Sequence, residues 1–213
     1  MSLWVYLCIE RSMNFDTHDI RIFNKEKIGN LFIFLSSNID NLFITKLLKL
    51  TYIIDELSVK ETGAPVTWLN YKVWKKGPVP QKVYYNLTFE GGEEFSDYIN
   101  VKSSKRINGL KITPKGEFDD SEFSDYEIEL LNRVIKDFGK LNSTQLVDFL
   151  HEEDSLWHKV VEERNLAPIF ESEEDANTSP YDIVLKEAIT DPFMVKMFDE
   201  MSDNIAFRER LEA

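Results

Sequence analysis

The residues best suited to chemistry lie between His151 and His158, a stretch that also holds three carboxylates, a serine and a tryptophan. Imidazole and carboxylate groups bind zinc and transfer protons. Histidines seven residues apart are expected two turns apart on one helix face. A zinc-protease helix has its histidines four residues apart, as in His-Glu-x-x-His, and Ser155 takes the place of the second. The spacing leaves open a loose site of two histidines and a carboxylate, but favours helix capping or core hydrogen bonds. We expect no bound metal.

Other catalytic and cofactor-binding patterns do not occur in the sequence. Gly91 and Gly92 lack the adjacent Gly-Lys-Ser or Gly-Lys-Thr of a phosphate-binding loop. No serine occupies the strained strand–helix turn of a hydrolase nucleophile, and the acidic C-terminal half lacks the ligand spacing and central glycine of a calcium loop. Cys8, the single cysteine, lies in an apolar segment, where a thiol is usually inert. We therefore expect a protein that is not an enzyme and binds no cofactor.

Charge is divided unevenly along the chain. Residues 1–116 hold 16 Lys and Arg against 12 Asp and Glu, a balance of +4, whereas residues 117–213 hold 9 against 26, a balance of −17. An acidic half repels phosphate backbones and can steer a basic protein partner. The alternative is that these charges only form a solvated, soluble surface.

Length and composition indicate a globular protein with one substantial core, since the 213 residues are 43% hydrophobic. A single cysteine permits no internal disulfide and suits a reducing cytoplasm. No apolar run approaches the roughly 20 residues that span a bilayer. The apolar run from Leu3 to Ile9 is not preceded by a basic residue, so we expect a strand or helix edge rather than a signal peptide. Met13 is an alternative start.

One helix is expected to organise the elements that position these residues. From residue 44 to residue 57, apolar side chains follow i+3 and i+4 spacings with extra positions between them, which predicts a helix buried over most of its circumference. Asp40 or Asn41 is expected to cap its start, and Gly63 to end it in a left-handed conformation. An amphipathic helix from Lys25 to Ser37 precedes it. The apolar positions of the organising helix are Ile44, Leu47, Leu48, Leu50, Ile53, Ile54 and Leu57.

A β-rich segment and a rigid elbow follow this helix. Residues 66–74 are rich in β-branched and aromatic side chains, which predicts a strand. Two prolines and two lysines with a glycine form the elbow at residues 75–80, where the prolines fix the backbone. Residues 81–87 are predicted to form a short helix.

These residues resemble the Panacea domain, the SocA-like antitoxin domain that is also described in phage-associated GepA proteins. The resemblance is carried in order by Lys-Leu-Leu-Lys-Leu-x-Tyr from Lys46, Thr-Gly-x-Pro from Thr62, the tryptophan of Val-Trp-Lys, and Gly-Pro-Val-Pro from Gly77. It is densest over residues 25–90 and weaker as far as about residue 160. It implies a mostly helical fold with a small β element, in a prokaryotic protein that neutralises a toxin encoded beside it. The SocA branch also implies an adaptor that delivers its partner to a protease.

Short strands and capped helices are predicted for the rest of the chain. Strands around residues 95–101 and 110–113 flank a basic loop from Lys102 to Arg106, and we expect them to form one antiparallel sheet with the Trp68–Trp74 segment. A capping box at Ser124–Glu127 begins the next helix. Further helices are predicted from Asn142, from Ser155 to Val161, and from Pro192 to about Leu211. Another is predicted from Pro180 to Ile189, with Ser179 as its cap and proline at its first position.

The predicted fold class is α+β, mostly α-helical, with a small antiparallel β-sheet or hairpin inserted between N- and C-terminal helices. Residues 1–24 are expected to form an N-terminal extension and residues 25–170 a Panacea-like helical domain. Residues 171–179 are acidic, with alanine as their one apolar residue, which predicts a mobile linker. Residues 180–213 are expected to form a helical segment packed on the same domain.

The elbow is the first candidate for contact with a partner. Its structural role would be a rigid turn that packs Trp74 into the core, and its functional role would be to offer aromatic and cationic anchors. The two interpretations carry equal weight. The candidate partner contacts are Trp74, Lys75, Lys76, Gly77, Pro78, Val79, Pro80 and Tyr84. Weaker candidates are His151, Trp157 and His158, because the resemblance also implies a histidine followed by a tryptophan in that region.

The leading hypothesis is a cytoplasmic antitoxin that neutralises a cognate toxin by direct protein–protein binding, with the toxin encoded by the adjacent gene. One alternative is a winged-helix-like nucleic-acid-binding regulator that uses residues 102–115, which hold five cationic side chains. The −17 balance of the following half argues against that alternative. Another is a proteolytic adaptor that delivers the toxin to a protease. No membrane partner is expected.

Overall fold

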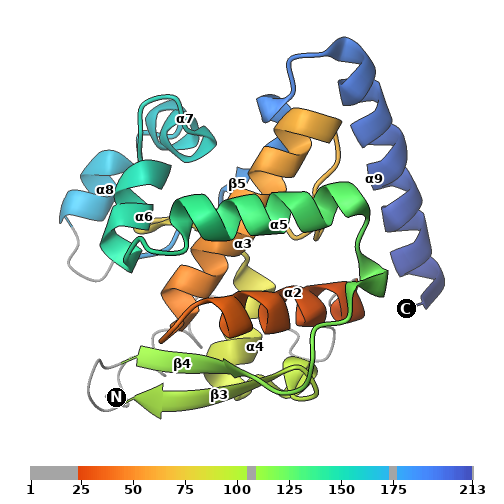
Figure 1. Cartoon of the computed structure of the whole chain (residues 1–213). Helices are drawn as coiled ribbons and strands as arrows, with labels where there is room; N and C mark the ends of the chain where they lie inside the picture. The colour runs from red at the N-terminus through yellow and green to blue at the C-terminus, as the bar shows by residue number, and fades with distance from the viewer. Residues whose placement is uncertain (1–23, 105–108, 173–176, 213) are drawn as a thin grey trace.

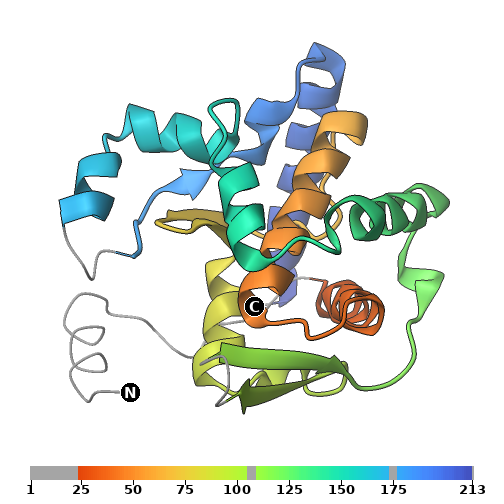
Figure 2. The ribbon, with the colours of Figure 1, turned by 60° about the vertical axis from the view of Figure 1, so that its left-hand side comes forward.

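The computed structural model describes residues 24–104, 109–172 and 177–212. The fold is α+β and mostly helical, with two small antiparallel sheets, which confirms the predicted fold class. One long helix, α3 (Ile44–Thr62), runs through the middle of the molecule, and the other elements surround it (Figures 1 and 2). The predictions for residues 1–23, which include Cys8 and Met13, concern a segment outside the described residues.

Helix α3 is buried on nearly all sides, as its apolar pattern predicted. Leu47 and Ile54 have no exposed surface, and Leu48 is 3% exposed. The helix packs against α2 (Lys25–Asn38), α5 (Asp125–Phe138), α6 (Ser143–Leu150) and both sheets. Gly63 ends it with a φ of 78°, as predicted, and the Gly63 N–H donates to the carbonyl of Val59 at 2.9 Å.

The predicted cap at the start of α3 was wrong. Neither Asp40 nor Asn41 caps the helix, because the N-cap position is Phe43, which makes no side-chain capping hydrogen bond. The residues before α3 associate with β4 (Gly109–Pro114) instead. Phe43 forms a β-bridge with Lys111, and the Asn41 side chain accepts a hydrogen bond from Lys111 Nζ at 2.9 Å. A strand contact has therefore replaced the local cap.

The prediction of a single sheet was also wrong. One sheet has the order β2-β1-β5, and a separate hairpin holds the other two strands. The two sheets stay apart because both edges of β1 are occupied, by β2 and by β5. On the β5 side, Lys72 forms an ion pair with Asp182 at 2.8 Å. The strands are β1 (Tyr71–Trp74), β2 (Gly77–Val79), β3 (Ile99–Ser104), β4 and β5 (Asp182–Ile183).

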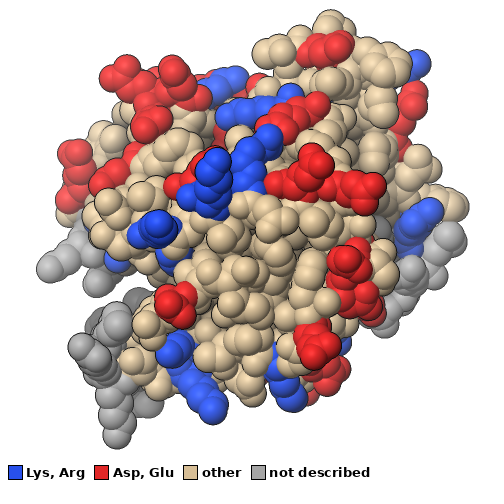
Figure 3. All heavy atoms as spheres, in the orientation of Figure 1, with Lys and Arg blue, Asp and Glu red and all other residues tan. Residues whose placement is uncertain are grey.

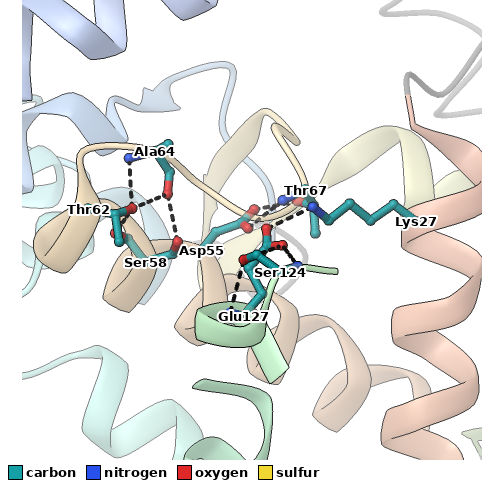
Figure 4. Close-up of polar contacts among 8 residues, drawn as sticks. All are labelled: Lys27, Asp55, Ser58, Thr62, Ala64, Thr67, Ser124 and Glu127. Carbon is teal, nitrogen blue, oxygen red and sulfur yellow. Dashed lines mark hydrogen bonds and ion pairs between the residues drawn. The ribbon is translucent and has the colours of Figure 1, made fainter. Parts of the chain in front are cut away.

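Three helices of the second half begin at the residues predicted to start them. Ser124 and Glu127 form the capping box of α5, and Glu127 also pairs with Lys27 of α2 at 2.7 Å (Figure 4). Asn142 caps α6 (Ser143–Leu150) together with Gln145, and Ser155 caps α7 (Leu156–Glu163). The remaining elements of the middle region are α4 (Gln81–Phe89), α8 (Ala167–Ser172), and the short 3₁₀ helices η1 (Glu93–Phe95) and η2 (Asp120–Glu122).

The helix predicted from Pro180 to Ile189 does not form. The Ser179 hydroxyl, which was expected to cap it, donates to the carbonyl of Val73 at 2.6 Å. The Val73 N–H in turn donates to the carbonyl of Tyr181 at 2.9 Å. Pairing with β1 thus makes this segment a strand, followed by η3 (Leu185–Ala188), while α9 (Pro192–Glu212) forms where it was predicted.

The predicted acidic linker, residues 171–179, is described only at its two ends. Residues 171 and 172 belong to α8, and the carbonyl of Asn177 accepts a hydrogen bond from the Lys75 N–H at 3.0 Å. Both described ends are therefore held by the fold.

Helix α9 contacts the segment before β1 through the rings of Phe198 and Trp68, whose centroids lie 5.3 Å apart.

Candidate partner-binding site

A pocket with a volume of about 310 Å³ lies between the start of α3, the β1–β2 hairpin and α4. Four of the predicted contact residues, namely Trp74, Lys76, Val79 and Tyr84, line it. The structure therefore gathers half of the predicted contact set around one recess. The other lining residues are Ile44, Thr45, Leu48, Lys49 and Asn177.

Trp74 forms a firmly held wall of this pocket. Its side chain is only 8% exposed, and its ring meets the Tyr84 ring edge-on, with centroids 4.9 Å apart. The Trp74 carbonyl accepts a hydrogen bond from Trp157 Nε1 at 2.8 Å. Trp74 Nε1 itself is buried and has no hydrogen-bond partner among the described residues. Trp74 therefore packs into the core, as the structural interpretation of the elbow predicted, and it also lines the recess.

Lys49 places a buried cation beside the hairpin. The side chain is 2% exposed, and its Nζ donates to the carbonyl of Pro78 at 2.6 Å. Burial lowers the pKa of Lys49 to about 7. The hairpin comes this close because Gly77 has no side chain: a Cβ built there would lie 3.2 Å from Lys49 Nζ, and its φ of +93° also favours glycine.

His151 and Trp157 lie behind the hairpin. Their rings stack with centroids 3.6 Å apart and an interplanar angle of 4°. A Cβ on Gly77 would also lie 3.6 Å from His151 Nε2, which is buried without a hydrogen-bond partner among the described residues. Burial, and then the positive charge of Lys49, lower the pKa of His151 to about 4. His151 is therefore a neutral support for the hairpin.

The two histidines do not share a helix face, so that prediction was wrong. His151 ends α6 and His158 lies in α7, because the chain turns before the cap at Ser155. His158 Nε2 instead lies 3.4 Å from a carboxylate oxygen of Glu162. Within the described parts of the chain, no group of three or more His, Cys, Asp and Glu side chains is arranged to hold a metal ion.

The remaining predicted contacts differ in exposure. Lys76 is exposed and Lys75 is half-buried, whereas Gly77, Pro78, Val79 and Pro80 are buried. The buried members can shape the site but offer little surface to a partner. Sequence reasoning did not place Lys49 or Thr45 among the candidate contacts. The available signal was a lysine between two leucines in a helix that is buried on nearly all sides, since a lysine at such a position must find an acceptor or a charge partner.

The arrangement suits binding. The lining combines apolar side chains with the donors of two lysines, a threonine and an indole, and it includes no carboxylate. None of the described helices is both long and apolar enough to cross a membrane.

Comparison with known proteins gives one match. The family model described as "Antitoxin SocA-like, Panacea domain" matches residues 47–158, from the first turn of α3 into α7. No curated protein and no solved structure matches the chain. The matched range includes Lys49, the hairpin, Tyr84 and the His151–Trp157 stack, and it covers more than half of the 213 residues. The chain therefore belongs to the SocA-like Panacea domain family of antitoxins.

Proposed function

We propose that this protein neutralises a toxin by binding it directly through the surface around the β1–β2 hairpin and its pocket. Family membership supports an antitoxin role in general. The observation that supports this surface is the pocket itself. Predicted contact residues from separate elements line it, and one of them, Trp74, has a buried N–H donor without an acceptor among the described residues.

The rigidity of the hairpin supports a binding role. It is hydrogen-bonded to the segment around β5 on one edge and to Trp157 behind it, and Lys49 holds the carbonyl of Pro78. A surface fixed before binding loses little conformational entropy when a partner docks. Tryptophan and tyrosine are also frequent anchors of protein–protein interfaces, and here Trp74 and Tyr84 brace each other.

The charge distribution fits a protein partner better than a nucleic acid. On the face drawn in Figure 3, some basic side chains gather above the middle with acidic side chains beside them, and the other basic side chains are scattered among acidic ones. On the β3–β4 hairpin, Lys111 and Lys115 are engaged by Asn41 and by the carbonyl of Ser96. A heparin column tests the nucleic-acid alternative, because a chain with a net charge of −13 should not be retained at moderate salt.

Co-expression tests the antitoxin role. Expression of the protein encoded by the adjacent gene should arrest growth, and co-expression of this chain should restore it. A neighbour that is harmless alone, or rescue by an unfolded variant, would refute the proposal. If rescue requires a host protease and the toxin disappears on co-expression, the adaptor alternative replaces neutralisation by binding.

Charge reversal tests the location of the surface. The double variant Lys75→Glu, Lys76→Glu should weaken rescue, because it inverts the charge at the rim of the pocket. The matched control is Lys136→Glu, Lys140→Glu, which makes the same change at two exposed positions at the end of α5. Equal loss of rescue in both variants would contradict a site at the hairpin.

A further inference from the structure

The pocket beside the hairpin is electropositive in a strongly acidic protein. Lys49 and Lys76 both line it, and none of its lining residues is a carboxylate, although the chain as a whole carries a net charge of −13. Its apolar lining comes from Ile44, Leu48 and Val79. The recess thus combines an apolar wall with cations, which is the composition expected for a ligand that has an aliphatic stem and an anionic group.

Two buried donors in this lining have unused hydrogen-bonding capacity. An ammonium group has three N–H donors, and the hydrogen bond of Lys49 goes to the carbonyl of Pro78. Lys49 takes part in none of the ion pairs formed among the described residues. Trp74 Nε1 has no acceptor in the described parts of the chain, and its residue is more than nine-tenths buried. Buried polar groups are normally satisfied, so both donors call for an acceptor.

The fold holds these donors in place at a cost in stability. An unsatisfied buried donor destabilises the folded state, and a buried lysine does so more strongly unless it is paired. The close approach of the hairpin also depends on Gly77, where any side chain would press on Lys49 Nζ. Costly features of this kind tend to be found at functional sites.

We propose that this pocket binds a carboxylate group presented by the toxin, with Lys49 Nζ and Trp74 Nε1 as donors to the carboxylate oxygens. The proposal rests on the proposed antitoxin function, since it names the chemical group that the antitoxin surface recognises. The carboxylate belongs either to an Asp or Glu side chain or to a polypeptide C-terminus, and both have the chemistry that the pocket requires.

Electrostatics favour such a ligand. The pKa of Lys49, lowered by burial to about 7, would rise when a carboxylate binds, because an adjacent opposite charge stabilises the ammonium form. Charge-assisted hydrogen bonds are about twice as strong as neutral ones. A carboxylate therefore accepts from both donors and also offsets the charge of the Lys49 ammonium, whereas a neutral amide or hydroxyl only accepts.

The first experiment needs no toxin. The full-length protein is titrated with N-acetyl-leucine, with the α-amide of N-acetyl-glutamate, with N-acetyl-leucinamide, and with inorganic phosphate. The readout is the indole N–H signal of Trp74 in a proton–nitrogen correlation spectrum, assigned by its loss in Trp74→Phe. We expect a saturable downfield shift with a carboxylate probe, in the millimolar range, and none with the leucinamide. The preferred carboxylate distinguishes a C-terminus from a side chain.

Variants test the two donors. Lys49→Met should weaken binding of the carboxylate probe at least about tenfold, which corresponds to about 1.4 kcal/mol. Trp74→Phe should also weaken binding. Because this variant lacks the indole signal, binding is followed at the backbone N–H signal of Gly77. With two variants, a poorly folded Lys49→Met protein does not block the test. Trp68→Phe is the matched control, because Trp68 stacks on Phe198 and is not part of the pocket lining. Equal binding of acid and amide, preferential binding of phosphate, or no shift at all would overturn the proposal.

The same variants separate this proposal from the antitoxin function. In co-expression, Lys49→Met and Trp74→Phe should lose rescue, whereas Trp68→Phe should retain it. If the carboxylate probes bind but the adjacent protein proves harmless, the antitoxin function fails while the carboxylate site stands. If rescue occurs and both pocket variants retain it, the antitoxin function stands and the assignment of the carboxylate to the toxin is overturned.

Discussion

Helix α3 buries two ionisable side chains, Lys49 and Asp55, and they differ in how their hydrogen-bonding capacity is met. Asp55 has no exposed surface. Its carboxylate accepts hydrogen bonds from the Thr67 N–H at 2.8 Å, from the Thr67 hydroxyl, and from the Tyr71 hydroxyl at 2.7 Å (Figure 4 shows the Thr67 contacts). Lys49 is almost as deeply buried, but it donates to one backbone carbonyl and lines a pocket.

This difference is what we expect if Asp55 serves the fold and Lys49 serves the proposed binding site. The hydrogen bonds of Asp55 join α3 to the segment that leads into β1, so its carboxylate fixes the position of that strand. Lys49 also touches the hairpin, but the pocket beside it offers no carboxylate to compensate its charge. A fully satisfied buried network specifies the fold, whereas a partly satisfied one destabilises it unless a ligand completes it. The predictions below test this contrast.

The largest effect is expected from Asp55→Ala. The substitution leaves the Thr67 N–H, the Thr67 hydroxyl and the Tyr71 hydroxyl without their acceptor in the core. We expect the free energy of unfolding to fall by roughly 3–5 kcal/mol, as when one partner of a buried charged network is removed. Urea denaturation followed by circular dichroism measures it. Asp55→Asn is the matched control. Its free energy of unfolding should fall much less, because the amide keeps an acceptor oxygen and nearly the volume of the carboxyl group. Equal losses in both variants would contradict a role as acceptor.

The pH dependence of stability should have opposite signs for the two groups. Burial raises the pKa of Asp55 to about 6 from 3.8, so the folded state binds its proton more tightly. Its contribution is therefore fully present below pH 3.8 and is lost as the pH rises through 6, an effect of about 3 kcal/mol. For Lys49, the unfolded state binds the proton more tightly between about pH 7 and 10.5, so stability rises with pH in that window.

Difference curves isolate these two contributions. The stability of the wild type minus that of Asp55→Asn should fall between pH 4 and 6, and that of the wild type minus Lys49→Met should rise above pH 7. Chemical denaturation at a series of pH values gives both curves. A flat difference curve for Asp55→Asn would show that burial does not raise the pKa of the Asp55 carboxyl. It would contradict the opposite pH dependence expected for the two groups.

A smaller change of the opposite sign is expected for Lys49→Met at neutral pH. Methionine fills a similar volume without a charge, and replacement of a buried ion by an apolar side chain is often neutral or stabilising. We expect the protein to gain about 1–2 kcal/mol at pH 7, after the loss of the hydrogen bond to Pro78 is included. A thermal melt in the absence of any partner measures it. A loss of several kcal/mol would instead place Lys49 in the same structural class as Asp55.

The sequence predicted those parts of the fold that depend on neighbouring residues. The apolar spacing of α3 is visible within one window of the chain, and the Gly63 end and the capping boxes at Ser124 and Asn142 are local motifs. The same reasoning failed where tertiary pairing overrode a local preference. The Ser179–Pro180 cap is a good helix start in isolation, but the free edge of β1 recruits this segment as a strand.

The candidate site was predicted only in part, because it is assembled over long distances in the sequence. Lys49 meets Pro78 across 29 residues and Trp157 meets Trp74 across 83, and no local pattern encodes either approach. The hairpin residues were found because their aromatic and proline composition is unusual. The prediction for the two histidines failed even though its correction was in the sequence, since the helix start predicted at Ser155 places His151 and His158 on different helices.

The smallest effect on stability is expected from Lys75→Glu, Lys76→Glu. Lys76 is exposed and Lys75 is half-buried, and substitutions of surface charges usually change stability by less than about 0.5 kcal/mol. The melting temperature of the double variant should therefore stay close to that of the wild type while its rescue of the toxin-expressing cell declines. This result would place the rim lysines with Lys49, as side chains that serve recognition and contribute little to the fold. A marked fall in melting temperature would mean instead that the rim lysines help to hold the hairpin in place, and loss of rescue could then not be assigned to recognition. If the partner is basic, the acidic second half of the chain should contribute to binding instead, and association of the two purified proteins should then slow markedly as salt is added.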